Sequence, residues 1–161
     1  MKILLVPASL PDFDACDLKV RRGIALGFAR MDEGQAAVSE VLGTIEAEPR
    51  PEPWGSYWAW CPEHDAHVGL CAFKAPPDSS GSVELAYFTF PELEGRGVAS
   101  QMVVQQIAMA RLHHVRSVTA HTLPVANASG NILRRLGFEY IGDVIDPEDG
   151  LVWAWSHTLT V

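Results

Sequence analysis

The sequence has few cysteines: its 161 residues include only three, Cys16, Cys61 and Cys71, and no two of them form a CxxC pair. Structural zinc sites use closely spaced ligand pairs, so this pattern disfavours one, and no cluster of aspartate, glutamate, histidine or cysteine suggests another metal. We therefore predict no metal centre. Scattered cysteines in odd number are typical of reduced, buried thiols, which predicts a cytoplasmic protein.

Positive charge is also scarce, because 12 basic residues face 20 acidic ones and give a formal net charge of -8. This balance disfavours a protein that binds nucleic acid or an acidic membrane surface, whereas a cationic substrate fits it. The apolar start of the chain, MKILLVPASL, is too short to span a membrane and lacks the pattern of a cleavable signal. We interpret it as a first β-strand.

The chain also lacks the glycine patterns of common nucleotide sites. Gly95 and Gly97 stand in the segment ELEGRGVAS, which matches neither GxGxxG nor GxxxxGK[ST]. Glycine lets a ligand approach backbone N–H groups closely, and a helix N-terminus offers unpaired N–H groups with a partial positive charge. The segment therefore suits a phosphate, and Arg96 adds a formal charge. A simple strand-to-helix turn explains the glycines equally well.

The remaining pattern predicts a mixed α+β chain. Short aromatic or β-branched segments bounded by turn residues predict strands, and segments rich in helix formers predict helices. The strands are expected at 2–6, 56–61, 67–73, 83–90, 117–123, 138–144 and 151–159, and the helices at 32–48, 96–112 and 127–137. Residues 10–31 give the least defined pattern. No repeat divides the chain, so we expect a single domain over residues 1–161.

Two of these strands enclose one helix in a βαβ unit. Because such a crossover returns the chain in the same direction, the strands 83–90 and 117–123 should be parallel. In the next helix, Asn127 is expected to be the N-cap and Gly137 to end the helix.

Several polar residues have structural explanations. His113 and His114 follow the helix of the βαβ unit. Stabilisation of the C-terminal end of that helix is a simpler explanation for them than a catalytic role. Asp146, Glu148 and Asp149 flank a proline, which predicts a turn.

Four aromatic residues, Trp54, Tyr57, Trp58 and Trp60, lie before or on the strand 56–61. Because side chains alternate along a strand, Trp58 and Trp60 share one face. Core packing explains at least one of them, and an aromatic wall suited to a cationic amine is the alternative.

The segments ELEGRGVAS and NASGNILRRLGF together resemble the GNAT superfamily of acyl-CoA-dependent N-acetyltransferases. The phosphate loop of that family reads Gln/Arg-x-x-Gly-x-Gly/Ala, and its next helix often begins Asn-x-Ser and ends in Gly-Phe. The matching positions here are Glu94, Gly97 and Ala99 in the loop, and Asn127, Ser129, Gly137 and Phe138 in the helix. The resemblance is specific over about residues 67–158. VELAYFTFPELEGRG, HTLP and DPEDGLVWAW are most similar to the branch of the Rim-type ribosomal-protein acetyltransferases.

This resemblance implies a GNAT fold: a central twisted mixed sheet of about seven strands, helices on both faces, and a splayed parallel strand pair that forms the CoA cleft. It implies acetyl-CoA as cosubstrate, a primary amine of a small molecule or peptide N-terminus as acceptor, and a monomer or homodimer. The pantetheine arm would pair with the first splayed strand and the pyrophosphate with the loop amides. The implied cofactor-binding residues are Phe88, Thr89, Phe90, Glu94, Gly95, Arg96, Gly97, Val98, Ala99, Ser100, Asn127 and Ser129.

Glu94 departs from the family pattern, since a carboxylate at this position repels a pyrophosphate. We expect its backbone amide to keep its role and its side chain to turn to solvent, with weaker CoA affinity or a changed ligand as the consequence. Helix capping alone also explains Asn127 and Ser129. A non-catalytic acyl-CoA-binding module is therefore the alternative function, and a protein with no CoA site is a third.

Three residues are candidates for the chemistry. An amine attacks a carbonyl only in its neutral form, so a base is expected in the cleft. Glu84, at the start of the splayed strand, is the first candidate, because related enzymes often carry a glutamate there; an exposed strand-end acid is the alternative. His121 is the second, since histidine changes charge near neutral pH, although it could simply be packed. The resemblance implies Ser129 as the acid that protonates the leaving thiolate, since the helix 127–137 contains no tyrosine, where many members of the family keep their acid; no dedicated acid is the alternative.

Overall fold

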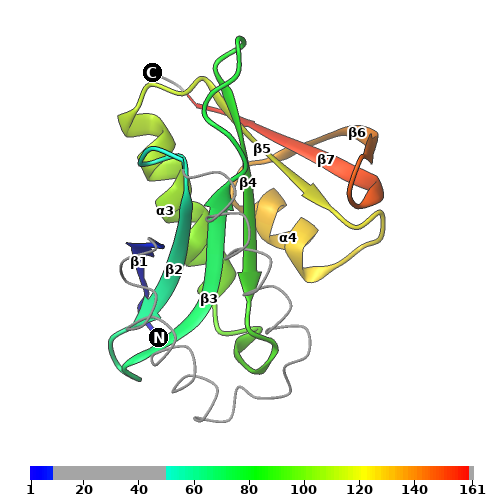
Figure 1. The fold of residues 1–161 in the computed structure, drawn as a ribbon. Helices are drawn as coiled ribbons and strands as arrows, with labels where there is room; N and C mark the ends of the chain where they lie inside the picture. Colours follow the sequence, from blue (N-terminus) through cyan, green and yellow to red (C-terminus); the bar gives the residue numbers. More distant parts are fainter. Residues whose placement is uncertain (9–49, 160–161) are drawn as a thin grey trace.

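The structure, a computed structural model, describes residues 1–8 and 50–159 (Figure 1). Its elements in chain order are β1 (Leu4–Pro7), β2 (Ser56–Cys61), β3 (Ala66–Phe73), β4 (Ser82–Thr89), the 3-10 helix η3 (Pro91–Leu93), α3 (Val98–Leu112), β5 (Ser117–Thr122), α4 (Ala128–Arg135), β6 (Glu139–Asp146) and β7 (Gly150–Thr158). The seven expected strands are present, with ends that differ by a few residues. The expected helix at 32–48 and the segment 10–31 lie outside the described residues.

The strands form one mixed sheet in the order β1-β2-β3-β4-β5-β7-β6. Each neighbouring pair is antiparallel except β4 and β5, which are parallel. The α+β fold class and the parallel pair predicted from the sequence are therefore confirmed. The parallel pair arises because α3 carries the chain back between the two strands, which is the geometry of a βαβ unit.

Strands β4 and β5 separate soon after they meet. Their ladder joins only Ser82 with Ser117, Val83 with Val118 and Glu84 with Thr119. Beyond Glu84, β4 continues to Thr89 alongside β3, and β5 continues alongside β7. In Figure 1 the strands β2, β3 and β4 stand upright on the page, whereas β5 and β7 extend to the right. The expected splay is thus present and opens just after Glu84.

Helix α3 begins two residues later than the sequence suggested. Residues 96–112 were expected to be helical, but α3 starts at Val98, and Gly95 and Gly97 have positive φ values of 74° and 80°. These left-handed conformations are incompatible with a right-handed helix, so the chain first makes a turn and the helix follows. At its other end His113 is the C-cap, as the capping interpretation of this histidine predicted.

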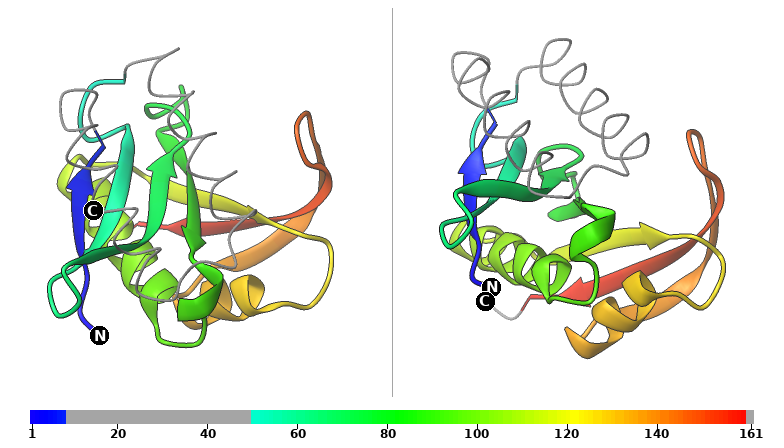
Figure 2. Two further views of the ribbon diagram at one scale, coloured as in Figure 1. Left: turned by 60° about the horizontal axis from the view of Figure 1, so that its bottom comes forward. Right: turned by 90° about the horizontal axis from the view of Figure 1, so that it is seen from below.

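Helix α3 packs against β3 and β4 and contacts α4 on the same side of the sheet (Figure 2). Its buried side chains Met102, Val103 and Ile107 join a core that includes Phe73 and Leu85. Because the apolar residues of α3 recur at a helical period, one face of the helix is buried and fixes its N-terminus beside the open end of β4.

Two glutamines of α3 cover the open edge of the sheet. Gln101 accepts a hydrogen bond from the Ile3 amide at 3.1 Å and donates one to the Met1 carbonyl at 3.0 Å. Gln105 repeats this pattern one turn later, with the Leu5 amide and the Ile3 carbonyl, both at 3.2 Å. Since residues four apart lie on one helix face, their amide groups replace a neighbouring strand and protect the edge of β1.

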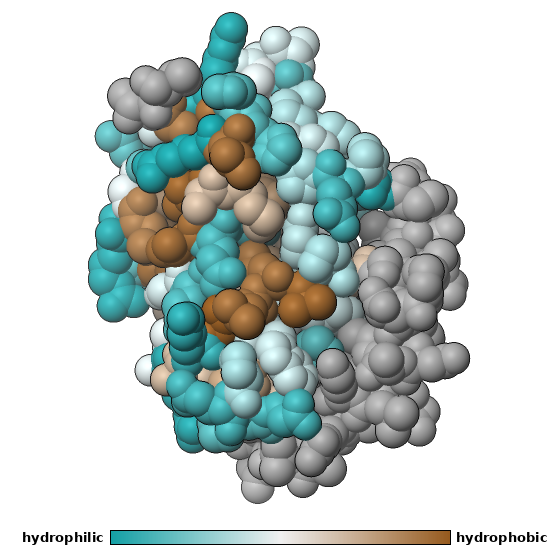
Figure 3. Space-filling view, turned by 90° about the vertical axis from the view of Figure 1, so that its left-hand side faces the viewer, coloured by the Kyte–Doolittle hydropathy of each residue, from teal (hydrophilic) through white to brown (hydrophobic). Residues whose placement is uncertain are grey.

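The surface around β1 and α3 is mixed in polarity. Figure 3 shows this side of the molecule, where brown apolar groups are separated by teal polar ones. The exposed apolar side chains of the two elements are Leu4, Val6, Val104 and Leu112. Among the described residues, neither helix has the length and apolar character that a membrane crossing requires.

The aromatic residues near β2 pack inside the protein. Trp58 is buried, and both Trp58 and Trp60 contact the buried His67, with ring centroids 5.2 Å apart in each case. Trp54 packs edge-on against Phe73 at 5.3 Å. Core packing is therefore correct for Trp58 and applies in part to the others.

Candidate active site

A cleft of about 880 Å³ opens on the α3 and α4 side of the sheet, where β4 and β5 part. Three segments line it: the end of β4, the loop into α3, and α4. Its lining residues are Tyr87, Phe88, Thr89, Leu93, Glu94, Gly95, Gly97, Val98, Ala99, Ser100, Ala128, Ser129, Asn131, Ile132, Arg134 and Arg135. Most of the cofactor-binding residues expected from the sequence are thus brought together in one cleft.

The glycine loop leaves open space at the start of α3. A Cβ added to Gly95 or Gly97 would meet no atom within 4 Å, so these positions form an open cradle. The first helical amide to find a carbonyl is that of Gln101, which donates to Gly97 at 3.1 Å. The preceding amides of α3 have no partner within the helix, and they carry the positive end of its dipole. This end of the cleft therefore suits an anion.

Positive charge in the cleft comes from α4. Arg134 and Arg135, in its last turn, line the cleft together with Glu94, whereas Arg96 is exposed and is not a lining residue. Arg134 also stacks over the Trp155 ring, with its guanidinium carbon 5.0 Å from the ring centroid. The arginine pair on α4 thus lines the same cleft as Glu94, the residue that departs from the family loop pattern.

Two hydroxyl groups meet across the cleft from the glycine loop. The Tyr87 phenol on β4 lies 2.5 Å from Ser129 Oγ in the first turn of α4. Asn127 caps this helix, because its side-chain oxygen accepts a hydrogen bond from the Gly130 amide at 2.8 Å. The expected capping role of Asn127 is confirmed, and Gly137 follows the end of α4 with φ of 86°. The cap fixes the position of Ser129 in the cleft.

On the opposite face of β4, Glu84 and His121 come together. Glu84 Oε1 lies 3.2 Å from His121 Nδ1 and 2.8 Å from Lys74 Nζ. Asp146 Oδ2 lies 3.5 Å from the same imidazole nitrogen and 3.8 Å from Lys74 Nζ. Four charged or titratable groups from β4, β5, β6 and the end of β3 thus form one cluster beside the splay.

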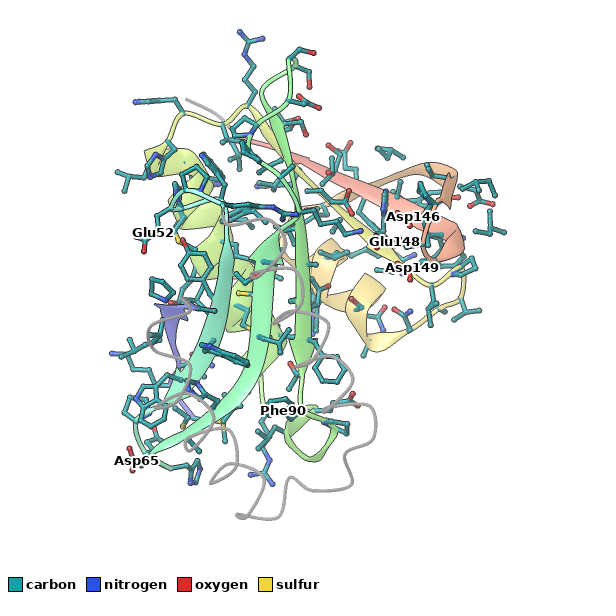
Figure 4. All side chains as sticks on the ribbon, viewed as in Figure 1. Glu52, Asp65, Phe90, Asp146, Glu148 and Asp149 are labelled. Atoms are coloured by element: carbon teal, nitrogen blue, oxygen red, sulfur yellow. The ribbon has the colours of Figure 1, made fainter. Side chains whose placement is uncertain are left out.

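The turn at the end of β6 brings Asp146 into this cluster. Its Oδ1 accepts hydrogen bonds from the Glu148 and Asp149 amides at 2.8 and 3.0 Å, as the predicted turn requires. Figure 4 shows the three acids together at the β6–β7 turn. These backbone hydrogen bonds lower the pKa of Asp146, with smaller contributions from Lys74 and His121. Asp146 is therefore ionised near neutral pH.

Lys74 stays charged between the carboxylates. Burial alone would lower its pKa, but the hydrogen bond to Glu84 and the charges of Glu84, Asp146 and Asp149 outweigh burial, so the pKa is raised. A group whose charged form has such partners keeps its proton at neutral pH. The cluster thus carries a fixed ammonium that balances part of its negative charge.

Among the residues that the structure describes, two groups have ligand atoms close enough for a metal ion: Cys61 with Glu63 and His64, and Glu84 with His121 and Asp146. The second group already contains the Lys74 ammonium 2.8 Å from Glu84. Cys61 and Cys71 are buried free thiols, as expected from the sequence.

Several members of the site were not predicted from the sequence. Asp146 was interpreted only as a turn residue, and no role was predicted for Tyr87, Lys74, Arg134 or Arg135. Strand alternation could have placed Tyr87 on the cleft face, but Asp146 and Lys74 reach the cluster only through tertiary contacts.

Phe90 occupies a different setting from its neighbours Phe88 and Thr89. Its amide donates to the Val68 carbonyl at 3.2 Å and its carbonyl accepts from the Leu93 amide at 2.8 Å. Figure 4 shows it at the end of β4, where η3 begins. Both of its backbone groups are thus engaged within the protein, and the open stretch of β4 ends at Thr89.

A mixed sheet that splays at its one parallel pair, with a cleft ending on a helix N-terminus, agrees with the GNAT fold that the sequence resemblance implies. The model of the acetyltransferase (GNAT) domain family matches residues 3–139. The chain belongs to this family, and its class of activity is that of an N-acetyltransferase. No curated protein is significantly similar in sequence.

Solved structures with the same fold include several acetyltransferases. The Salmonella typhimurium enzyme that modifies the N-terminal serine of the 50S ribosomal subunit protein L7/L12 is 16% identical, with a TM-score of 0.67 over 99% of this chain and 96% of that one. A ribosomal L7/L12 alpha-N-protein acetyltransferase in complex with coenzyme A is 16% identical, with a TM-score of 0.67 over 99% of this chain and 95% of that one. A chimera of the Vibrio cholerae spermidine N-acetyltransferase and hSSAT is 12% identical, with a TM-score of 0.71 over 98% of this chain and 96% of that one. At these identities the likeness shows the fold alone.

Proposed function

We propose that this protein transfers the acetyl group of acetyl-CoA to the primary amine of a small molecule or peptide N-terminus, by direct attack of the amine on the thioester. The observation that carries the proposal is the cleft at the β4–β5 splay, which joins an anion cradle to a pair of hydroxyl groups. A charged cluster that includes a histidine lies on the other side of β4. The family match supports acetyl transfer over a non-catalytic binding module.

The residues of the cleft fit coenzyme A. Amides from Gly95 to Ser100 would hold the pyrophosphate in the cradle, where no Cβ obstructs the backbone. The backbone of Phe88 and Thr89 would pair with the pantetheine arm, because β4 has no partner strand on its β5 side there. The Thr89 hydroxyl has no hydrogen-bond partner among the described residues, which supports a ligand at this position.

Glu84 and His121 would act together as the base. A proton on His121 Nδ1 faces the carboxylates of Glu84 and Asp146, and this leaves Nε2 with the lone pair that accepts the amine proton. A carboxylate that orients an imidazole in this way also stabilises the imidazolium that forms. On the other side of the strand, Ser129 would protonate the departing sulfur, and Asn127 would contact the pantetheine arm.

The proposal includes further features that follow from composition. The net charge of -8 and the acidic cluster suit a cationic acceptor, with no nucleic-acid or membrane partner. The reaction as written uses no metal ion, because Lys74 supplies positive charge within the cluster. We propose a single domain that acts in the cytoplasm as a monomer or homodimer.

The direct test combines calorimetry with turnover. Acetyl-CoA should bind with one site per chain, and free thiol should appear when an amine from a panel of peptides with free N-termini, polyamines and amino acids is added. Thiol release that depends on the amine, with a product heavier by one acetyl group, supports the proposal. Binding without turnover across the panel would favour the non-catalytic module, and no binding would exclude a CoA site.

Replacement of Glu94 by glutamine should tighten acetyl-CoA binding several-fold. The change removes a negative charge from a lining residue of the cleft while it keeps the size of the side chain.

Conversely, the double variant Arg134→Gln with Arg135→Gln should weaken acetyl-CoA binding about tenfold, and this loss of affinity should be smaller at high salt. Arg111→Gln, in the last turn of α3 and not a lining residue, is the matched control. Calorimetry at two ionic strengths measures all of these, and unchanged affinity in the α4 double variant would contradict the assignment.

A further inference from the structure

We propose that Tyr87 is a positioning residue for the transfer reaction: it holds the Ser129 hydroxyl toward the thioester sulfur and replaces the proton that Ser129 gives up. The inference builds on the proposed function and adds to it a residue that the sequence analysis did not consider. It also answers why α4 can lack a tyrosine, because β4 supplies one.

The position of the two hydroxyl groups carries the inference. Tyr87 and Ser129 both line the cleft, and their oxygens are 2.5 Å apart. Tyr87 belongs to β4, whereas Ser129 belongs to the helix that follows β5, so their hydrogen bond spans the two sides of the splay. A short hydrogen bond at the point where two separated elements meet holds the two oxygens together and directs the proton of whichever hydroxyl donates. If Tyr87 donates to Ser129, the Ser129 proton is free to point into the cleft.

The surroundings of the phenol keep it protonated. Burial raises the pKa of Tyr87, and the hydrogen bond to Ser129 opposes this only in part. Its cross-strand partner Cys71 is a thiol whose pKa is also raised by burial, so no thiolate faces the phenol at neutral pH. The other titratable or charged groups on the surrounding elements are His67 on β3, Glu84 on β4, Glu94 and Arg96 before α3, Arg111 on α3, His121 on β5, and Arg134 and Arg135 on α4. An acid works in its protonated form, so Tyr87 can serve at all pH values below its raised pKa.

The proton balance of the step is complete. The amine forms a C–N bond with the carbonyl carbon and loses one proton to the base formed by Glu84 and His121. The C–S bond breaks with its electron pair on sulfur, which takes the Ser129 proton, while Ser129 takes the Tyr87 proton. Water returns a proton to Tyr87 and removes one from the base, so the enzyme ends unchanged.

Strand alternation places the two proton transfers on opposite sides of β4. Glu84 and Tyr87 are three residues apart on one strand, so their side chains point to opposite faces. Tyr87 lines the cleft, and Glu84 is not among its lining residues. The amine is therefore deprotonated on one face of the sheet and the thiolate is protonated on the other.

Tyr87→Phe tests the inference, because it keeps the ring and removes only the hydroxyl. We expect kcat to fall about 100-fold, within the range for a lost proton donor, while the Kd for CoA changes less than threefold. Ser129→Ala should lower kcat by a similar factor. The double variant should lower kcat little further, since both hydroxyl groups belong to the same proton-transfer path. Tyr57→Phe is the control: its hydroxyl donates to the Pro53 carbonyl at 2.8 Å outside the cleft, and burial raises its pKa to about 12. It should retain kcat.

A fluorinated tyrosine placed at position 87 gives readouts that a purely structural role would not move. Fluorine makes the phenol more acidic with little change in shape, so the alkaline limb of kcat should move to lower pH. The fluorine NMR signal of the variant should titrate at that same pH, and it should shift when CoA is added without any acceptor.

The outcomes separate the two proposals. Wild-type protein that fails to turn over any amine would overturn both. If wild type is active and Tyr87→Phe keeps kcat within twofold, the Tyr87 inference alone is wrong. If Tyr87→Phe does not fold, the fluorinated protein decides: an alkaline limb and a fluorine signal that both stay in place overturn the inference, and a joint shift supports it.

Discussion

Glu84→Gln is expected to lower kcat about 100-fold with a small effect on the affinity for acetyl-CoA. The substitution removes the negative charge 3.2 Å from His121 Nδ1, so the imidazolium that forms during proton transfer is no longer stabilised by this oxygen. Steady-state kinetics with the panel amine that reacts fastest measures kcat, and calorimetry measures the affinity for acetyl-CoA.

This variant should remain folded. Lys74 loses its contact with Glu84 but keeps Asp146 at 3.8 Å, and partly exposed ion pairs of this kind contribute about 1 kcal/mol or less. Glu139→Gln, at an exposed position on β6, is the matched control and should leave kcat unchanged. His121→Gln should lose a similar factor, and the double variant should fall little below either single one. Wild-type kcat in Glu84→Gln would remove Glu84 from the mechanism.

Local sequence patterns were enough to predict the frame of this site. Alternating and β-branched residues placed the seven strands, and the order strand, helix, strand fixed the parallel pair that splays. The glycines of ELEGRGVAS marked the cradle because positive φ and an open approach leave few other choices of residue. The expected helix at 96–112 began two residues too early, because the left-handed conformation of Gly97 delays the start of α3 to Val98.

The partners within the site could not be predicted in the same way. Glu84 and His121 were separate candidates in the sequence, and only the sheet register brings them to 3.2 Å. Asp146 joins them because the β6–β7 turn folds beside β5, which no local pattern records. Tyr87 was overlooked because the search for a hydroxyl acid stayed on the helix 127–137, whereas the tyrosine comes from the facing strand. Long-range contacts therefore decided the chemistry, while local patterns decided the frame.

Trp155→Ala is expected to cost about 3–5 kcal/mol of the free energy of unfolding and to weaken acetyl-CoA binding as well. Trp155 on β7 is 1% exposed, and its Nε1 donates to Thr122 Oγ1 at 3.0 Å. Helix α4 lies directly on the ring: a Cβ at Gly130 would be 3.2 Å from it, and Arg134 stacks over it at 5.0 Å. Removal of the ring therefore leaves a cavity under the helix that carries one side of the cleft.

Two comparisons separate loss of packing from loss of the site. Trp155→Phe keeps an aromatic ring under α4 and should cost about 1–2 kcal/mol, mainly for the hydrogen bond to Thr122. Trp153→Ala removes a half-buried ring from the same strand and should cost less than Trp155→Ala, with no effect on acetyl-CoA affinity. Chemical denaturation and calorimetry measure these quantities. If Trp155→Ala were as stable as Trp153→Ala and bound acetyl-CoA normally, α4 would be held by something other than this ring, and the Asn127 cap and the Tyr87 hydrogen bond would be enough to position Ser129.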